Sequence, residues 1–309
     1  MSLASLLSKN GPSGFGYAST AGQVTAGLDL AGKHILLTGS NSGLGLETAR
    51  VLLMRGATVI GTARTVEKAR EALTPLGGTM IPVACELSEP DSVRACVRTV
   101  RALGVPLDAI IANAGIMALP HNEQLFGVER QLFTNHVGHF ILVTGLVESL
   151  AANGRVVILS SGAHNNAPDV GIQLDNLSGE RNYQAWKAYG QSKLANLLFA
   201  RSLARRFAAT DRVANAVHPG VIATNLGRHM NAATRFGLLA VAPLFMKSPA
   251  EGAATQTWAA VHPDTAKITG EYLSDCNVKP SSKLGQDLAL AERLWEATEA
   301  IVARIGGPA

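Results

Sequence analysis

The residues with the clearest chemical potential are Tyr189 and Lys193, in the segment YGQSKLAN (189–196). Residues four apart lie on the same face of a helix, so the phenol and the ammonium group are neighbours. A positive charge about 4–5 Å from a phenol favours the phenolate, and at an effective dielectric near 20 it lowers the phenol pKa by roughly 2–3 units. We therefore expect Tyr189 to titrate at about pH 7–8 and to act as an acid–base group. A plain surface pair has the same spacing, so other parts of the chain must decide between the two interpretations.

A glycine-rich stretch, TGSNSGLG (38–45), lies between an expected strand and an expected helix. Glycines allow a tight turn and a close backbone approach, and the N–H groups at a helix N-terminus can bind a pyrophosphate. The spacing G-x-x-x-G-x-G differs from the commoner G-x-G-x-x-G fingerprint, and any tight strand-to-helix turn would look similar. Its place in the first expected βαβ unit favours a dinucleotide site formed by Gly39, Ser40, Asn41, Ser42, Gly43, Leu44 and Gly45.

The end of the second expected strand indicates which dinucleotide binds. NAD-binding sheets usually carry an Asp or Glu there, but this chain reads GTARTVEK (61–68), with no acid before Glu67. Arg64 stands where the 2′-phosphate of NADP would lie, and a guanidinium group suits a phosphate. A solvated arginine at a helix start is the alternative interpretation. We expect NADP(H) as the cofactor, with NAD(H) as the alternative.

Short apolar runs alternate with longer amphipathic ones from residue 33 onward. Strands are expected at HILLTG, ATVIGTA, GTMIPVAC, LDAIIANAG, GRVVILSS and RVANAVHPG, and helices at 43–55, at 66–73, after Pro90, at 124–150 and from the Tyr189 segment towards Arg206. This alternation predicts an α/β fold, a single doubly wound (Rossmann) domain with a mostly parallel sheet of about seven strands. Residues 1–30 are expected to form a surface N-terminal extension, and residues 31–309 one dinucleotide-binding domain.

The composition is that of an ordinary globular protein and argues against several classes. The chain of 309 residues has 27 Lys and Arg against 23 Asp and Glu, a net charge of +4, which is a small excess for a nucleic-acid-binding protein. Three cysteines without CxxC spacing argue against a zinc site or a disulfide framework and favour a cytoplasmic location. No apolar run reaches the roughly 18 residues of a transmembrane span. His136, His139, His164 and His218 suggest a metal site, and His136 and His139 share a helix face. No third ligand at a suitable spacing accompanies that pair, so we assign no metal.

Seven motifs occur in order along the chain: STAGQVTAGLDLAGK, TGSNSGLGLETAR, ANAG (112–115), NHVGHF (135–140), VVILSSGAH (156–164), YGQSKLAN and HPGVIATNL (218–226). With these motifs the chain resembles the short-chain dehydrogenases/reductases, and within them the retinol-dehydrogenase-like and WW-domain-oxidoreductase-like branch. The resemblance covers nearly the whole chain. It differs from the usual family pattern at Ala112, where Asn is usual, and at Glu86, where Asp is usual; both positions lie on the adenosine side of the expected site.

The resemblance implies roles for individual residues. It implies that Tyr189 is the catalytic acid/base, that Lys193 is its partner and contacts the nicotinamide ribose, that Ser161 bonds the substrate oxygen, and that Asn135 anchors a water in a proton relay. Ser161 as a plain turn cap, and Asn135 as a polar residue satisfied by backbone, are the alternatives. Cofactor contacts are implied for Tyr189 and Lys193 and for Glu86, Leu87, Asn113, Ala114, Gly115, Pro219, Gly220, Val221, Ile222 and Thr224.

The chemistry of carbonyl reduction requires such a set. A carbonyl oxygen that becomes an alkoxide needs a proton and a hydrogen-bond donor, and Tyr189 and Ser161 can supply them. We expect an oxidoreductase that transfers a hydride between NADP(H) and an alcohol/carbonyl pair. The alternative is a non-catalytic dinucleotide-binding regulator or scaffold. The related light-dependent protochlorophyllide reductases are disfavoured because too few of their cysteines are matched.

The segment 225–248 is expected to form a substrate lid, because FGLLAVAPLFM (236–246) is apolar and no charge follows until Lys247. Such a patch would cover a pocket, a partner or a membrane surface, or would pack as ordinary core. The resemblance to retinol dehydrogenases favours a lipophilic alcohol, aldehyde or ketone as the small-molecule substrate. The physiological substrate, the direction of the reaction and homo-oligomerisation are left open.

Overall fold

The computed structural model of the protein describes residues 2–222 and 246–307. Its strands are β1 (His34–Thr38), β2 (Thr58–Ala63), β3 (Met80–Ala84), β4 (Leu107–Ala112), β5 (Gln124–Leu125), β6 (Val128–Glu129), β7 (Leu150–Leu159), β8 (Val213–His218), β9 (Tyr272–Ser274) and β10 (Asn277–Lys279). Its α-helices are α1 (Leu3–Leu7), α2 (Ala21–Val24), α3 (Gly43–Met54), α4 (Val66–Leu73), α5 (Pro90–Ala102), α6 (Arg130–Leu132), α7 (Gly138–Leu146), α8 (Ala185–Arg206), α10 (Pro249–Gly252), α11 (Ala254–Val261) and α12 (Leu288–Arg304).

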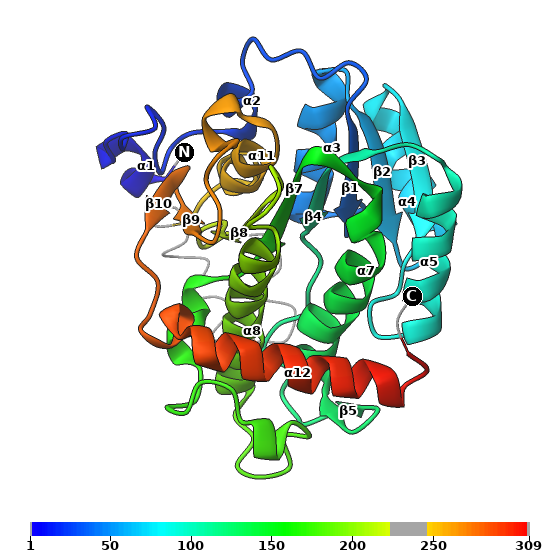
Figure 1. The fold of residues 1–309 in the computed structure, drawn as a ribbon. Coiled ribbons are helices and arrows are strands. Elements are labelled where there is room, and N and C mark those ends of the chain that lie inside the picture. The colour runs from blue at the N-terminus through cyan, green and yellow to red at the C-terminus, as the bar shows by residue number, and fades with distance from the viewer. Residues whose placement is uncertain (1, 223–245, 308–309) are drawn as a thin grey trace.

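A central sheet of eight strands has the order β10-β9-β8-β7-β4-β1-β2-β3 (Figure 1). Its strands pair in parallel except for the edge pair β9–β10, which is antiparallel. The strand order reverses between β1 and β4, and open α/β sheets bind ligands at the carboxyl ends of the strands beside such a point. The doubly wound, mostly parallel fold expected from the sequence is confirmed.

The expected strand number was about seven, and the sheet has eight strands. The difference comes from the edge hairpin, whose strands β9 and β10 have three residues each. The turn between them is made by Asp275 and Cys276, both in the left-handed region with φ of 53° and 57°. A hairpin this short has no periodic pattern, and its turn lacks the glycine or asparagine that usually marks positive φ.

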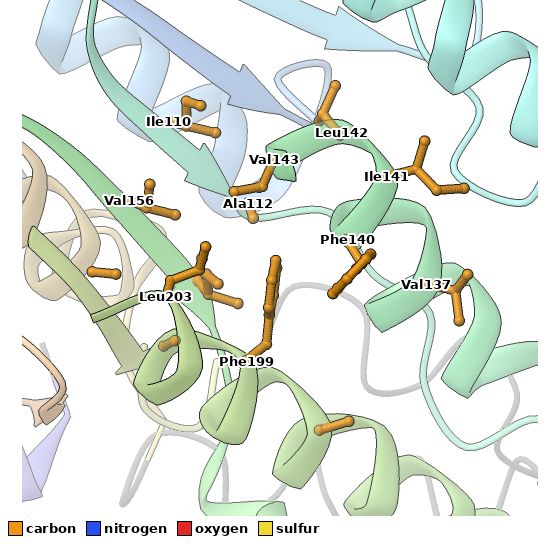
Figure 2. Close-up of a cluster of buried hydrophobic side chains, with 14 of the residues drawn as sticks. Ile110, Ala112, Val137, Phe140, Ile141, Leu142, Val143, Val156, Phe199 and Leu203 are labelled. Atoms are coloured by element: carbon orange, nitrogen blue, oxygen red, sulfur yellow. The ribbon is translucent and has the colours of Figure 1, made fainter. Parts of the chain in front are cut away.

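Side chains from alternate strand positions fill two cores, one on each face of the sheet. On one face α5, α7 and α8 cover the strands, and α12 packs on α8 (Figure 1). Figure 2 shows Phe140 of α7 and Phe199 of α8 facing each other over this core, and their ring centroids lie 5.2 Å apart. On the other face α3 and α11 cover the strands, with Trp258 of α11 buried. Burial of each large side chain stabilises the fold by about 1.5–3 kcal/mol, so both cores hold the site-bearing strand ends in place.

Two local expectations were wrong. The segment 124–150 is not one helix: it begins with the hairpin β5–β6, because Phe126 and Gly127 take positive φ of 51° and 76°. The N-terminal extension does not simply lie on the surface, because Ala21 and Val24 of α2 are buried and α2 packs against α11. No helix in the part of the chain that the structure describes has the length and apolarity that crossing a membrane requires.

Candidate active site

The glycine-rich loop joins β1 directly to α3. Gly39 and Gly43 have φ of 67° and 54°, which a side chain would disfavour. A Cβ at Gly45 would lie 2.1 Å from the carbonyl oxygen of Gly39, so only glycine allows this packing of the helix on the loop. Ser42, the N-cap of α3, makes no side-chain capping bond. The first N–H groups of α3 therefore have no capping side chain, which is the arrangement that binds a phosphate.

A cleft of about 510 Å³ opens in front of this loop. Of the residues expected to contact a cofactor, the following line it: Gly39, Asn41, Ser42, Gly43, Leu44, Gly45, Arg64, Glu86, Leu87, Asn113, Ala114 and Gly115. Ser40 is different, because it is fully buried and both its N–H and its hydroxyl donate to the carbonyl oxygen of Thr62. Ser40 holds the loop to β2, while its neighbours form the wall of this dinucleotide cleft.

The turn at Asn113 and Ala114 is held by a hydrogen-bond chain that the sequence did not point to. The backbone N–H groups of both residues donate to Oγ1 of Thr38, at 2.9 and 3.0 Å. Thr38 Oγ1 also lies 2.9 Å from Nε2 of His139, whose Nδ1 lies 2.9 Å from the carbonyl oxygen of Asn135. Because a carbonyl can only accept, Nδ1 of His139 carries the proton and the Thr38 hydroxyl donates to Nε2. His139 thus fixes the direction of the Thr38 hydroxyl and, through it, the turn.

Arg64 follows β2 at the far end of the dinucleotide cleft. Its side chain is 69% exposed, and its nearest acidic partner is Glu86, with 4.0 Å between Nε and Oε2. An exposed ion pair at this distance contributes little, at most about 1 kcal/mol. The guanidinium group of Arg64 is therefore available to a phosphate in the cleft.

A second cleft, of about 500 Å³, contains the groups with acid–base chemistry. Ser161, Tyr189 and Lys193 line it, and so do Pro219, Gly220, Val221 and Ile222. It shares four lining residues with the dinucleotide cleft, which makes the two clefts continuous: Leu44, Asn113, Gly115 and Ile116. We refer to it as the catalytic cleft.

The end of β7 and the middle of α8 are locked together beside this cleft. Ser160 Oγ donates to the carbonyl oxygen of Lys193 at 2.7 Å, and Lys193 Nζ donates to the carbonyl oxygen of Leu159 at 3.1 Å. Ser161 starts a 3₁₀ helix (Gly162–Asn166), and its Oγ accepts from the N–H of Ala163 at 3.1 Å. Ser161 is therefore a cap as well as a cleft residue, and the cap does not use its hydroxyl proton.

The pKa of Tyr189 differs from the expected one. Burial raises it to about 12, and a hydrogen bond with Ser161 offsets only part of this rise. Lys193 lies with Nζ 5.7 Å from the centroid of the Tyr189 ring, and burial lowers the pKa of Lys193 to about 8. The prediction of a phenol titrating at about pH 7–8 is wrong, because the burial that brings the two groups together also removes the water that would stabilise the phenolate. Tyr189 is a protonated phenol at neutral pH.

Asn135 lies in a π-helical turn (Phe133–Val137) between α6 and α7. Its side chain accepts from the N–H of Ile116 at 2.8 Å and donates to the carbonyl oxygen of Ile116 and to Oγ of Ser192, both at 2.9 Å. These bonds agree with the alternative interpretation of Asn135, in which its side chain forms its hydrogen bonds mainly with the backbone. Asn135 connects the loop after β4 to α8, and π-helical turns are frequent at functional sites.

Comparisons with known proteins show the family of the chain. A family model described as short chain dehydrogenase matches residues 33–235. The chain belongs to the short-chain dehydrogenase/reductase family. It is 41% identical over 303 residues to the short-chain dehydrogenase TIC 32 B, chloroplastic, of Brassica napus, covering 93% of this chain and 94% of that one. It is 36% identical over 293 residues to retinol dehydrogenase 14 of Mus musculus, covering 88% and 86%, and lies in the retinol-dehydrogenase-like branch.

Solved structures of short-chain dehydrogenases/reductases and similar proteins share the fold. A crystal structure of an uncharacterized protein from Mycobacterium Paratuberculosis aligns with a TM-score of 0.73 and 34% identity, covering 90% of this chain and 96% of that chain. The angucycline C-6 ketoreductase LanV with bound NADP aligns with a TM-score of 0.64 and 25% identity, covering 80% and 95%. The protein is thus an oxidoreductase of a family that acts on CH–OH groups with a nicotinamide dinucleotide.

Several residues of the catalytic cleft were not singled out from the sequence. Trp186, Met117 and Ile116 line it, and the Trp186 ring lies edge-on to Tyr189 with 6.1 Å between ring centroids. Trp186 precedes Tyr189 by three residues, and residues three apart are neighbours on a helix face. This spacing could have predicted from the sequence that Trp186 lies beside Tyr189. His218, considered from the sequence only as a metal ligand, also lines the cleft.

Part of the expected site lies outside the described residues. Thr224 and positions 225–245 of the expected lid belong to that part of the chain. At its described end, Met246 and Lys247 are buried, and Lys247 Nζ forms an ion pair with Asp275 at 2.6 Å. Within residues 2–222 and 246–307 no group of three or more His, Cys, Asp or Glu side chains is placed to hold a metal ion.

Proposed function

We propose that the protein is an NADP(H)-dependent oxidoreductase that interconverts a lipophilic alcohol and its aldehyde or ketone. The observation that carries this proposal is that Ser161, Tyr189 and Lys193 line a single cleft continuous with the cleft of the glycine-rich loop. A substrate carbonyl beside the nicotinamide end of a dinucleotide would then lie next to a proton donor and a second hydrogen-bond donor.

Tyr189 is the proton donor in this proposal. When bound, the dinucleotide supplies the hydride. Because its pKa is raised to about 12, Tyr189 holds its proton at neutral pH and can give it to an oxygen that becomes an alkoxide. Ser161 Oγ already accepts from Ala163 N, so its hydroxyl hydrogen can stabilise the same oxygen. The Lys193 ammonium favours the phenolate that is left after transfer.

NADP(H) is supported over NAD(H) by the charge at the end of β2. Arg64 lines the dinucleotide cleft, and its contact with Glu86 at 4.0 Å is weak. A guanidinium group in this place forms charge-assisted bonds to a 2′-phosphate. LanV, which has a similar fold, was solved with bound NADP.

A lipophilic substrate is supported by the outer wall of the catalytic cleft. Trp186 and Val221 line this wall and are 43% and 50% exposed. Exposed large apolar side chains that gather at a cleft mark a surface that an apolar ligand covers. The relative named retinol dehydrogenase has, by its name, a lipophilic alcohol as substrate. The cytoplasmic location stays a prediction, and homo-oligomerisation stays open.

A series of straight-chain aldehydes tests this function. Each buried CH₂ contributes about 0.8 kcal/mol, so kcat/KM with NADPH should rise up to several-fold per added methylene until the pocket is full. Trp186→Ala should flatten the rise. Val278→Ala, which truncates an exposed valine on β10, is the control and should leave it unchanged. A flat series with the wild-type protein, or a sugar or hydroxy acid outperforming every apolar carbonyl, contradicts the proposal.

A further inference from the structure

The peptide group between Ser161 and Gly162 lies just beyond the end of the hydrogen-bonded sheet. The N–H of Ser160 donates to the carbonyl oxygen of Val217 at 2.8 Å, and the register of β7 with β8 ends at the Leu159–Val217 pair. Ser161 therefore leaves the sheet where strand pairing no longer determines its position. Its hydroxyl nevertheless has to be held in a fixed place to bond a substrate oxygen.

Two histidine side chains bond this peptide group from its two ends. The carbonyl oxygen of Ser161 lies 2.7 Å from Nδ1 of His164, and the N–H of Gly162 donates to Nδ1 of His218 at 3.1 Å. The carbonyl requires a proton on Nδ1 of His164, and the N–H requires a lone pair on Nδ1 of His218. The N–H of Ser282 donates to Nε2 of His164 at 3.1 Å, which agrees with that tautomer.

The charge state of the two rings suits these bonds. Burial lowers the pKa of His218 to about 4, with Lys247 and His164 adding to the lowering and Asp275 opposing it. Burial also lowers the pKa of His164 below its ordinary value. Both rings are therefore neutral at pH 7, where His218 keeps the lone pair that accepts.

Tyr272 of β9 supports both rings. Its ring lies parallel to that of His218, with 6.5 Å between centroids and 6° between planes, and edge-on to that of His164 at 4.9 Å. His218 also accepts from the N–H of Gly220 at 3.4 Å. One ring thus connects the Ser161 side of the catalytic cleft with the Gly220 side.

We propose that His164 and His218 are positioning residues that clamp the Ser161–Gly162 peptide group and thereby fix the Ser161 hydroxyl in the cleft. This inference rests on the proposed function, in which Ser161 bonds the substrate oxygen. In this proposal the two histidines act on Ser161 through the backbone, by their bonds to the carbonyl oxygen of Ser161 and the N–H of Gly162. The motifs of the expected catalytic residues assign no role to His164 or His218.

The test compares two substitutions of His218. In His218→Asn the side-chain oxygen replaces Nδ1 as acceptor, whereas His218→Leu removes the acceptor. We expect amide hydrogen exchange at Gly162 to accelerate about tenfold or more in the Leu variant and to stay near the wild-type rate in the Asn variant. We expect kcat with NADPH and an aldehyde to fall about 10- to 100-fold in the Leu variant, with the aldehyde KM changed far less, and to recover in the Asn variant.

His262→Leu is the matched control, because His262 Nδ1 also accepts a backbone N–H, from Asp264 at 3.2 Å, away from both clefts. It should leave the exchange at Gly162 and kcat unchanged. Unaltered exchange at Gly162 in His218→Leu, or an Asn variant as impaired as the Leu variant, overturns the clamp. The exchange measurement decides this even if the wild-type protein reduces no aldehyde, an outcome that would contradict the proposed function instead.

Discussion

Replacing Lys193 by methionine should make the protein more stable while removing its activity. Burial lowers the pKa of Lys193 from 10.5 to about 8, so the folded state disfavours the ammonium that the unfolded chain carries freely. At about 1.4 kcal/mol per pKa unit, this shift costs about 3 kcal/mol of folding free energy at pH 7, where both states still bind the proton. Methionine fills a similar volume without a charge.

The hydrogen bond lost in Lys193→Met offsets little of this gain. Lys193 Nζ donates to the carbonyl oxygen of Leu159 at 3.1 Å, but Asn196 Nδ2 donates to the same oxygen at 2.9 Å, so that carbonyl stays bonded in the variant. A net hydrogen bond contributes about 1 kcal/mol. We therefore expect the free energy of unfolding to rise by about 2–3 kcal/mol.

Urea unfolding without cofactor measures this difference. The pKa shift also sets how stability changes with pH. Between pH 8 and 10.5 the unfolded chain binds the Lys193 proton and the folded protein does not. The free energy of unfolding of the wild-type protein therefore contains a contribution that rises with pH in this range. Lys193→Met should lack that contribution. Lys187→Met, an exposed lysine of the same helix, is the control and should change stability by less than about 0.5 kcal/mol. A Lys193→Met protein that is less stable than wild type would refute the reasoning.

Two further predictions concern the cofactor and acid stability. Arg64→Asp should weaken NADPH binding by about 1.5–3 kcal/mol, roughly 10- to 150-fold, and spare NADH in a fluorescence titration. Arg98→Asp, at an exposed position of α5, should spare both cofactors. Equal losses of the two cofactors in Arg64→Asp would contradict the role of Arg64. Burial lowers the pKa of His136 to about 3 and of His139 to about 4. As the pH falls from about 6.5 to 4, these two histidines therefore bind protons only in the unfolded chain. The free energy of unfolding should fall over that pH range. His136→Leu should reduce the pH slope of the unfolding free energy by about one proton, and an unchanged slope would show that His136 is not neutral in the folded protein.

The fold was predictable from the sequence because its strands and helices are long enough to show their periods. The parallel strands near the dinucleotide cleft have five to ten residues, and their Val- and Ile-rich runs alternate with amphipathic helices. The β9–β10 hairpin and the β5–β6 hairpin could not be predicted in this way, because two or three residues carry no period. Their turns rely on positive φ at Phe126 and Cys276, residue types that rarely mark such turns.

Residues of the site were predictable where chemistry fixes the residue type. The Tyr189–Lys193 pair and the glycines of the loop after β1 can be recognised in the sequence from their residue types and their spacing. The pKa of Tyr189 was not, because it depends on how much water reaches the phenol, which only the packing determines. The supporting roles of His139 and His218 were also missed, because the two rings act through contacts with Thr38 and Gly162, which lie far away in the chain.

The measurement that tests the central claim most directly is the transfer of deuterium from NADPH labelled at the reactive C4 position to an apolar aldehyde. The wild-type protein should produce an alcohol that carries the deuterium on its carbinol carbon. Tyr189→Phe, which keeps the packing of the buried ring but has no proton to give, should bind NADPH nearly as well and transfer deuterium at least about 100-fold more slowly. A wild-type protein that transfers no deuterium to any carbonyl, or a Tyr189→Phe protein that retains more than about a tenth of the wild-type rate, would contradict the account.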